Sequence, residues 1–452
     1  MSDISTDRPD AQIDIEVLTS VDARAALRSD RPHNGRGGAH MSPPRVLLVA
    51  LDNWYGTARL PSCLQAAGFT VGLLSEPQVY VARSRHVDFH LPISVKAIRH
   101  GQWQAPAAAI ALFAPDFILP ADENAVCFLQ FLAGVESSPL QAVLQRSLGD
   151  RRSFAARGDR NQLLEIADRA GIACAVHAAA TDATAAKAFG DRHGWPLYLK
   201  RDGTFAGQGV RKCPDAMALQ MAYRELAAET LTIWTPRGAL RQGRALLRAA
   251  VFGTDPLSDL TGASALSVEA EVIGRPAFHT AVAVDGHCLA GISAEVELFH
   301  PEPTGPSTRV RLHHDADMTR AAKVLARILG LSGFFGLDFI RQPDGSLVLL
   351  EFNQRPTSVA HLGRLVGTDL CAALFAGLRG LAMPETPAAA ETLVALYPQD
   401  WLRDPLAVDR APFLADIPWH EPELLAALNA RLELNIDATG PNFTTRQPVL
   451  AD

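Results

Sequence analysis

The sequence predicts an α/β domain followed by a larger α+β region. Strands and helices alternate over residues 44–135, which is the order typical of a parallel sheet covered by helices. Between residues 195 and 356, several strands instead follow one another directly, with hairpin signals at "DG" (285–286) and "PDG" (343–345). We therefore expect a parallel sheet first and antiparallel sheets after it.

The composition argues against two classes of protein. The chain has 452 residues, of which 48% are hydrophobic, and its mean hydropathy is near zero, which is too polar for a membrane protein. A formal net charge of −7 without a basic stripe argues against nucleic acid as the main partner. Six scattered cysteines without a CxxC spacing predict reduced thiols in a cytoplasmic protein.

Residues 1–43 are expected to form a disordered leader. They are polar, carry several Asp and Arg residues, and end in a stretch rich in glycine and proline. They lack the basic start and the apolar stretch of a signal peptide. The first predicted domain therefore begins at residue 44.

The predicted α/β domain opens with "RVLLVAL" (45–51), a continuous apolar run suited to a strand buried on both faces. A loop and a helix that ends at Gly68 follow. Two more helices flank the last strand, "DFILP". The later strands are expected at 70–76, 86–93 and 116–120.

The α+β region begins with two amphipathic helices, each closed by a glycine. A strand, a glycine-rich turn and a strand follow at 195–213. The segments 266–274 and 277–298 resemble a meander, and 333–356 is a hairpin that turns at "PDG". Helices are expected at 159–172, 182–194, 215–229 and 315–331.

The predicted hairpin carries a constellation of polar residues. Alternation along the strand "VLLEFNQRP" places Glu351, Asn353 and Arg355 on one face, and the turn brings Asp338 alongside Glu351. Neighbouring carboxylates repel, and a cation between them removes that cost. The oxygens of two acids and one amide suit Mg²⁺, and Arg355 can form two parallel hydrogen bonds to a phosphate or carboxylate. The alternative is a polar face of an antiparallel sheet in contact with water.

A second constellation lies in "LYLKRDGTFAGQGV" (197–210). Lys200 lies at the end of an apolar strand, and the loop that follows contains Gly203, Gly207 and Gly209. Glycines let backbone N–H groups turn toward an anion, and a lysine beside them adds a point charge for the same phosphates. The alternative is an ordinary flexible β-turn. "HHDAD" (313–317) has the composition of a metal site, but it precedes a helix, where acids complement the helix dipole.

The two constellations in this order resemble the ATP-grasp superfamily, from about Asp159 to Pro384. The strand lysine matches Lys200, the mobile glycine-rich loop matches 203–209, and the hinge strand matches "VEAEVIG" (268–274). The resemblance implies that the oxygens of Asp338, Glu351 and Asn353 hold magnesium and that Arg355 steadies the transferred phosphoryl group.

The resemblance also implies the domain organisation. A Rossmann-like pre-ATP-grasp domain over 44–135 would precede a two-lobed ATP-grasp domain over 136–385, with its lid lobe at about 185–268. Residues 386–452 would be a short helical extension that covers the active site or forms a dimer contact.

Further site residues follow from the same resemblance. Where the family often has an Asp-Lys pair, this chain has Asp159-Arg160, and Arg160 can reach a phosphate in place of the lysine. Glu269 and Glu271 are both candidates for the adenine amino group, and Glu269 is preferred. Arg309 and Arg311 share a strand face and are candidates to hold an acyl phosphate, although a solvated edge is nearly as plausible. Independently of the resemblance, the loops after two strands of the first domain make Trp54, Tyr55, Asp122 and Glu123 candidates for contacts to substrate or nucleotide, although purely structural loops are equally plausible.

The function implied is that of a cytoplasmic, Mg²⁺- and ATP-dependent ligase. The carboxylate of a small molecule would be activated as an acyl phosphate and joined to an amine, with release of ADP and phosphate. Amino acids and peptide-like molecules are among the substrates considered, and a homodimer is left open. The alternatives are another ATP-grasp chemistry, carboxylation or phosphorylation, and a nucleotide-binding protein without catalysis.

Overall fold

The structure is a computed structural model, and it describes most of the chain after residue 41. Within that part, residues 43–452 form one compact unit. The predicted leader lies almost wholly outside the described residues. The described ranges are 42–99, 101–135, 140–202, 209–228, 266–302, 305–383, 390–404 and 413–431.

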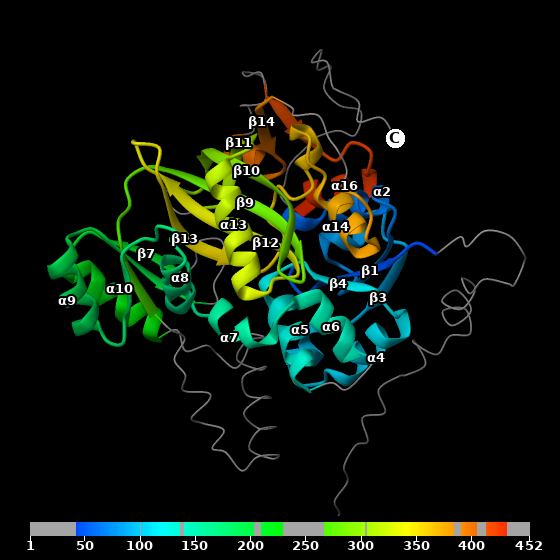
Figure 1. Cartoon of the computed structure of the whole chain (residues 1–452), viewed down its shortest axis with the longest axis horizontal. Coiled ribbons are helices and arrows are strands. Elements are labelled where there is room, and N and C mark those ends of the chain that lie inside the picture. The colour runs from blue at the N-terminus through cyan, green and yellow to red at the C-terminus, as the bar shows by residue number, and fades with distance from the viewer. Residues whose placement is uncertain are drawn as a thin grey trace, which may run out of the picture. The chain divides into compact units, whose positions relative to one another are not determined.

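The first sheet is parallel, as predicted, with the strand order β3-β2-β1-β4 (Figure 1). Its central strand β1 (Arg45–Ala50) is buried on both faces, which explains its continuous apolar run. Helices α2, α4 and α5 pack against its strands. The remaining strands are β2 (Thr70–Ser75), β3 (Phe89–Pro92) and β4 (Phe117–Pro120). The helices around them are α2 (Leu60–Ala66), α3 (Val95–Arg99), α4 (Gln104–Phe113), α5 (Glu123–Val135) and α6 (Leu140–Leu148).

The second sheet has seven strands in the order β13-β12-β9-β10-β11-β14-β15. Alternate residues of β9 (Arg275–Val284) face two different cores. Phe278 and Val282 pack toward the first sheet, whereas Ala281 and Ala283 pack toward helix α13 (Ala316–Leu329). The other strands are β10 (His287–Phe299), β11 (Ser307–His313), β12 (Gly333–Arg341) and β13 (Leu347–Asn353).

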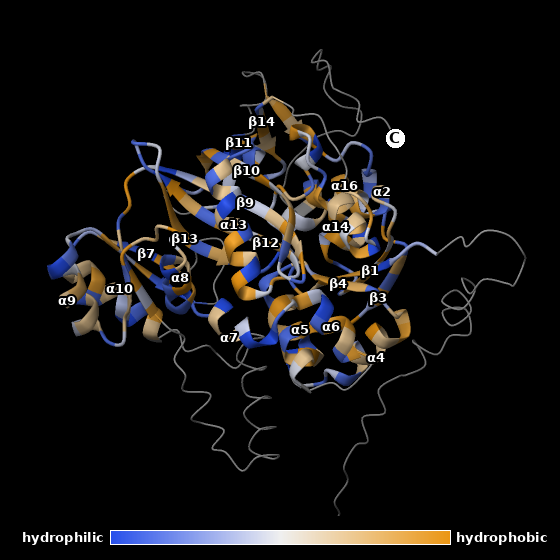
Figure 2. Cartoon of the chain, viewed as in Figure 1, coloured by the Kyte–Doolittle hydropathy of each residue, from blue (hydrophilic) through white to orange (hydrophobic). Residues whose placement is uncertain are grey.

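Helix α13 shows how the sequence sets the helix limits. Asp315 caps its start by accepting hydrogen bonds from the backbone N–H groups of Asp317 and Met318. Gly330 ends it at φ +58, a conformation that favours glycine. Figure 2 shows hydrophobic and hydrophilic residues on opposite sides of such helices, as expected for helices that cover a sheet. Helices α7 (Phe154–Arg157), α8 (Arg160–Arg169) and α14 (Leu370–Arg379) also pack in this part of the chain.

The third sheet is small and antiparallel, with the order β5-β8-β6-β7. Strand β8 (Leu266–Ala270) pairs with β5 and β6, so the predicted meander of 266–274 with 277–298 is wrong. The chain passes from this sheet to the second at Gly274, where a Cβ atom would lie 2.2 Å from the carbonyl oxygen of Arg341. Helices α9 (Ala183–His193) and α10 (Ala216–Ala228) cover the sheet formed by β5 (His177–Ala179), β6 (Leu197–Arg201), β7 (Val210–Cys213) and β8.

The C-terminal extension is not purely helical as predicted. Strand β14 (Thr392–Leu396) pairs with β11, and β15 (Leu414–Asp416) pairs with β14, so both belong to the seven-stranded sheet. Tyr397 and Trp401 pack with Tyr80 of the first domain in one apolar cluster. Helices α15 (Gln399–Arg403) and α16 (Pro422–Arg431) complete the extension.

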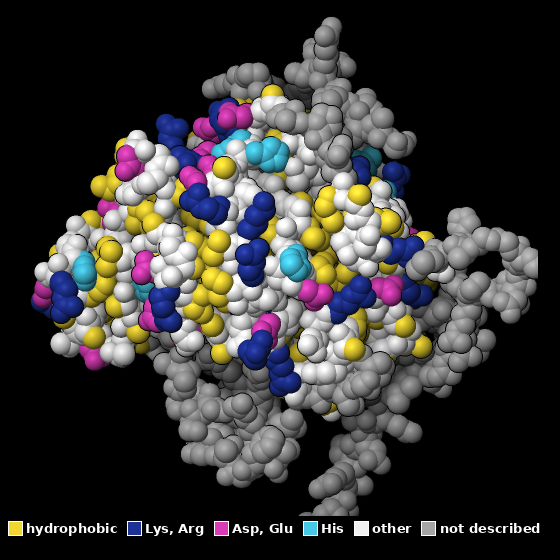
Figure 3. All heavy atoms as spheres, in the orientation of Figure 1, with side chains coloured by type: hydrophobic (Ala, Val, Ile, Leu, Met, Phe, Trp, Pro, Cys, Tyr) yellow, Lys and Arg dark blue, Asp and Glu magenta, His cyan; other side chains and the backbone are white. Residues whose placement is uncertain are grey.

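Two further findings concern the surface and the helices. Figure 3 shows acidic and basic side chains interspersed over the face that it draws. Among the described residues, no helix combines the length and the apolar character needed to cross a bilayer.

A pair of leucines in the extension tests whether it is integral to the core. Leu396 is fully buried among residues of both large sheets, whereas Leu402 is 39% exposed. We expect Leu396→Ala to lower the free energy of unfolding by about 2–5 kcal/mol because it leaves a cavity in a packed core. Leu402→Ala is the matched control and should cost much less. Equal losses in denaturant titrations of both variants would contradict this packing.

Candidate functional site

The candidate site is built on the hairpin of β12 and β13. Its turn closes with a hydrogen bond from the N–H of Gly345 to the carbonyl of Gln342 at 2.9 Å, and Gly345 takes φ +88. In the resulting register Asp338 lies directly opposite Glu351. The predicted juxtaposition of the two carboxylates is confirmed.

Two further residues of β13 and the segment after it approach this pair. Asn353 donates a hydrogen bond from Nδ2 to Oδ2 of Asp338 at 3.0 Å. Arg355 donates from Nη2 to Oδ1 of Asn353 at 3.4 Å, and its Nε lies 3.5 Å from Oε1 of Glu123. The hairpin thus presents two carboxylates, an amide and a guanidinium together, as the alternation of the strand predicted.

Burial and charge act differently on the two carboxyl groups. Burial and, to a smaller extent, the charge of Glu351 raise the pKa of Asp338 to about 7. Burial also acts on Glu351, but Arg160, Lys200 and Arg355 together hold its pKa below the usual value. Near neutral pH, Glu351 is therefore ionised while Asp338 still takes up a proton. A divalent cation would relieve the repulsion and displace that proton, which fits the hard oxygen ligands that Mg²⁺ prefers.

Arg160 connects this hairpin to the third sheet. It begins helix α8, where Asp159 caps the helix by accepting a hydrogen bond from the N–H of Gln162. From there its Nη1 donates to the carbonyl of Leu350 at 3.2 Å and its Nη2 to Oε1 of Glu351 at 3.1 Å. Its Nε lies 3.7 Å from Asp202 and 4.0 Å from Glu269. These partners raise the pKa of Arg160 against the effect of burial.

The two acids proposed for the adenine amino group have different surroundings. Glu269 is 1% exposed and accepts a hydrogen bond from Nζ of Lys200 at Oε2, while its buried Oε1 accepts none from the described residues. Glu271 instead pairs with Lys212 at 2.6 Å. An unsatisfied buried acceptor favours a donor on a bound molecule, so the geometry favours Glu269 over Glu271.

The glycine-rich loop is only partly described. Gly203 and Gly207 lie outside the described residues, whereas Gly209 accepts a hydrogen bond at its carbonyl from the N–H of Arg201 at 2.9 Å. Strands β6 and β7 flank the loop and pair with each other, with Lys200 opposite Val210. The two predicted strands are confirmed, whereas the predicted turn lies mostly outside the described residues, and the phosphate-binding role of the loop stays a prediction.

A cavity of about 180 Å³ lies between the hairpin and the first domain. Asp338, Asn353 and Arg355 line one side, and the loops after β1 and β4 line the other. Carboxyl ends of parallel strands meet at one edge of a sheet, so this placement follows from the topology. From the first domain, Asp52, Trp54, Asp122 and Glu123 contribute to the wall.

Three of the four first-domain residues predicted as contacts therefore line the cavity. Tyr55 does not, because it packs with Tyr397 in the apolar cluster of the extension. Asp52 was missed, although it lies in the loop directly after β1 and the same rule would have found it. Thr357 was also missed, and its buried hydroxyl has no hydrogen-bond partner among the described residues.

The acids of the first domain have distinct tasks. Asp122 accepts hydrogen bonds from the backbone N–H groups of Leu51 at 2.8 Å, Asp52 at 3.0 Å and Ala125 at 2.8 Å, so it ties β1 to helix α5. Burial and the nearby Asp52 raise its pKa to about 7. Asp52 accepts both hydrogen bonds of the Asn124 amide, at 2.7 and 2.8 Å. Burial raises the pKa of Asp52 as well.

The structure does not bring Arg309 and Arg311 into this cavity. Arg309 pairs with the buried Asp400 at 2.5 Å and stacks 4.1 Å above the ring of Phe413. Arg311 pairs with Glu297 at 2.8 Å. Both arginines thus pair with acidic residues outside the cavity. Their catalytic role stays a prediction that the geometry does not support.

Comparisons with solved structures identify the fold. A biotin carboxylase domain of the Hydrogenobacter thermophilus 2-oxoglutarate carboxylase matches with a TM-score of 0.56 and 14% identity, covering 78% of this chain and 74% of the other. Biotin carboxylase from Campylobacter jejuni gives 0.55 and 15%, covering 77% and 74%. N5-carboxyaminoimidazole synthetase from Staphylococcus aureus gives 0.53 and 12%, covering 77% and 81%.

The chain has the ATP-grasp fold. The predicted architecture, a parallel α/β domain followed by a two-lobed ATP-grasp fold, is confirmed. The sequence itself matches no family model and none of the curated proteins compared with it. The identities of 12–15% show a common fold, and the substrates have to be argued from the geometry of the candidate site.

The raised pKa of Asp338 predicts a pH-dependent metal affinity. If Asp338 is a ligand of Mg²⁺ as predicted, the metal requires its ionised carboxylate, and protons would compete with Mg²⁺ below the pKa of about 7. The affinity for Mg²⁺-ADP should therefore rise as the pH increases through 7 and level off above it. Asp338→Asn removes the competing proton, so its affinity should be weaker and almost independent of pH.

Calorimetric titrations with Mg²⁺-ADP at about pH 6 and pH 8 measure this difference. Asp344→Asn is the matched control, because Asp344 is an exposed acid in the turn of the same hairpin. It should behave as the unaltered protein does. A pH dependence that persists in Asp338→Asn would assign the proton to another group.

Proposed function

We propose that this protein is an ATP-dependent ligase that activates a carboxylate as an acyl phosphate and joins it to an amine. The observation that carries the proposal is the facing pair Asp338 and Glu351, because Asp338 lines a cavity that reaches the first domain together with Arg355. A protein that only bound a nucleotide would have no need for two facing carboxylates and a guanidinium at the place where a second substrate fits.

The nucleotide would lie between the third sheet and the hairpin. Lys200 and Arg160 would neutralise its phosphates, and both now hold carboxylates that a phosphate could replace. The unsatisfied oxygen of Glu269 would accept a hydrogen bond from the adenine amino group. Asp338, Glu351 and Asn353 would hold Mg²⁺, which supplies positive charge to the phosphoryl oxygens when bound.

The residues of this chain would then act by position and charge. Arg355 lies next to the metal ligands and lines the cavity, so it would stabilise the negative charge on the transferred phosphoryl group. No side chain has to form a covalent bond, because the substrate carboxylate itself attacks the γ-phosphate. The acyl phosphate formed would stay in the cavity until an amine displaces phosphate.

The charges of the cavity fit a small substrate that carries an amine as well as a carboxylate. Arg355 on one wall can bind a carboxylate, while Asp52 and Glu123 on the other can bind an ammonium group. The hydroxyl of Thr357, which has no hydrogen-bond partner among the described residues, adds a hydrogen-bonding group to the cavity lining. We therefore place an amino acid or a peptide-like molecule first among the substrates.

Carboxylation is the second candidate. The Hydrogenobacter thermophilus domain is described in complex with MgADP and bicarbonate, and bicarbonate is an acid that the same chemistry would activate. Bicarbonate alone has no ammonium group for Asp52 and Glu123 to bind, and this ranks carboxylation below the ligase.

Product analysis tests the proposal. A panel of amino acids, other small acids and bicarbonate is offered with ATP, Mg²⁺ and a mixture of amines, and nucleotide products are separated by chromatography. We expect ADP and phosphate, and no AMP, with an amino-acid-like acid. With the amine omitted, hydroxylamine should trap the acyl phosphate as a hydroxamate.

Three outcomes would change the assignment. Stoichiometric AMP and pyrophosphate would mean an acyl-adenylate and would overturn the mechanism. Turnover with bicarbonate alone among the acids would favour carboxylation. ADP bound with Mg²⁺ but no turnover across the panel would favour a non-catalytic nucleotide-binding protein.

A further inference from the structure

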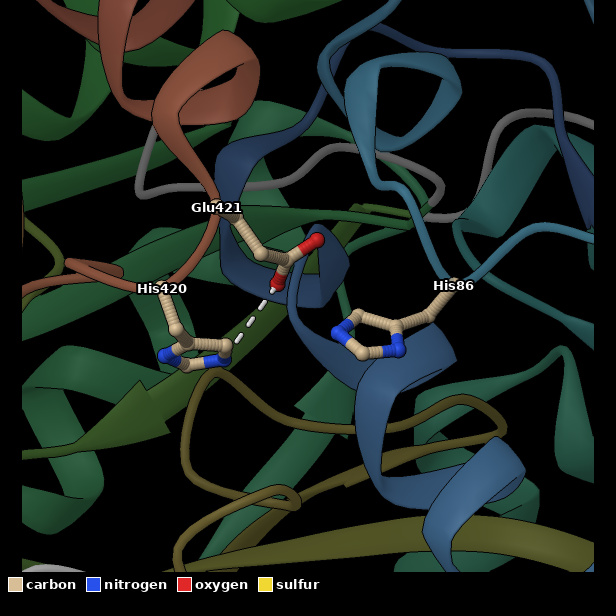
Figure 4. Close-up of side chains that lie close together, drawn as sticks. All are labelled: His86, His420 and Glu421. Carbon is tan, nitrogen blue, oxygen red and sulfur yellow. Dashed lines mark ion pairs between the residues drawn. The ribbon is translucent and has the colours of Figure 1, made fainter.

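Three side chains with metal-binding atoms meet far from the hairpin in sequence. His86 follows the short helix η3 (Tyr80–Arg83) of the first domain, and His420 and Glu421 directly precede helix α16. One ligand atom of each lies within 4.8 Å of the others. Figure 4 shows the two imidazole rings and the carboxylate pointing toward a common centre.

Glu421 is an unusual residue in this position because it is buried. It is 1% exposed, and its Oε2 accepts a hydrogen bond from the hydroxyl of Ser84. Its Oε1 is buried and accepts no hydrogen bond from the described residues. The atom nearest to Oε1 in the cluster is Nε2 of His420, at 3.8 Å. A buried carboxylate oxygen without a partner is costly, and a cation at this point would remove the cost.

His86 is already oriented as a metal ligand would be. Its Nδ1 lies 2.7 Å from Oε1 of Gln65, which can only accept, so Nδ1 carries the proton and Nε2 keeps its lone pair. Nε2 now accepts a long hydrogen bond from Nε of Arg85 at 3.4 Å, which a metal would replace.

We propose that His86, His420 and Glu421 form a zinc site. Two imidazoles and one carboxylate are a ligand set typical of Zn²⁺ with a fourth position for water. Zn²⁺ at about 2.0–2.2 Å from each ligand would bring the three ligand atoms to roughly 3.3 Å from one another. The approach required from 4.8 Å or less is small, and the side chain of His420, which is 57% exposed, is free to make it.

The site would fasten the C-terminal extension to the first domain. Ser84 and Glu421 are 337 residues apart in sequence, and helix α16 already packs against η3. A metal bound by residues of both segments stabilises the folded chain, because the unfolded chain does not hold the ligands together. The proposed zinc site is independent of the proposed ligase site, because it shares no residue with the hairpin or the cavity.

Zinc titration of the full chain tests the site. The protein is first freed of metal with a chelator and then titrated calorimetrically with ZnCl₂ in millimolar Mg²⁺, which occupies the hairpin carboxylates. We expect one zinc per chain and a rise in melting temperature. His420→Ala should weaken zinc binding at least about tenfold and abolish that rise. His287→Ala is the matched control, because His287 is exposed on β10, and it should bind zinc normally.

Cobalt provides a second readout that does not depend on stability. Co²⁺ in a tetrahedral site absorbs visible light, and the bands should appear in the unaltered protein and in His287→Ala but not in His420→Ala or His86→Ala. Equal zinc affinity in the unaltered protein and His420→Ala would overturn the proposal. So would the failure of the unaltered protein to bind one zinc per chain.

Discussion

The repulsion between Asp338 and Glu351 is the constraint on which the site depends. The hairpin holds the two carboxylates opposite each other, and because the side chain of Glu351 is only 36% exposed, water screens their repulsion only in part. Three positively charged side chains offset this negative charge: Arg160 from the start of α8, Lys200 from the third sheet and Arg355 from the segment after β13. The lobes of the fold are therefore drawn together by charge at the point where they meet. A bound metal would complete this compensation and leave the cations to phosphate oxygens.

Much of this arrangement could be predicted from local sequence. The turn at 343–345 sets the register of the hairpin, and the period of a strand decides which side chains share its face, so the positions of Asp338, Glu351 and Asn353 follow from counting. The end of β6 gave the place of Lys200 in the same way. Trp54, Asp122 and Glu123 line the cavity because the carboxyl ends of parallel strands meet at one edge.

What could not be predicted depends on partners distant in sequence. The apolar pattern of β8 shows that it is a strand but does not tell which sheet it joins. The resemblance placed Arg309 near the site, yet the side chain pairs with Asp400 of the extension instead. In "HHDAD", Asp315 caps α13 and His314 lies 2.8 Å from the carbonyl of Val366, so the acids and histidines there have structural tasks. The group that does resemble a metal site, His86 with His420 and Glu421, has no local signature at all.

The most direct test of the account is the coupling between Mg²⁺ and ADP. ADP affinity is measured with Mg²⁺ and with a chelator, in the unaltered protein, in Glu351→Gln and in Glu165→Gln, which changes an exposed carboxylate of α8. The account predicts that Mg²⁺ tightens ADP binding in the unaltered protein and in Glu165→Gln, and that Glu351→Gln loses most of this effect. If Mg²⁺ tightens ADP binding to Glu351→Gln as strongly as to the unaltered protein, the paired carboxylates do not hold the metal.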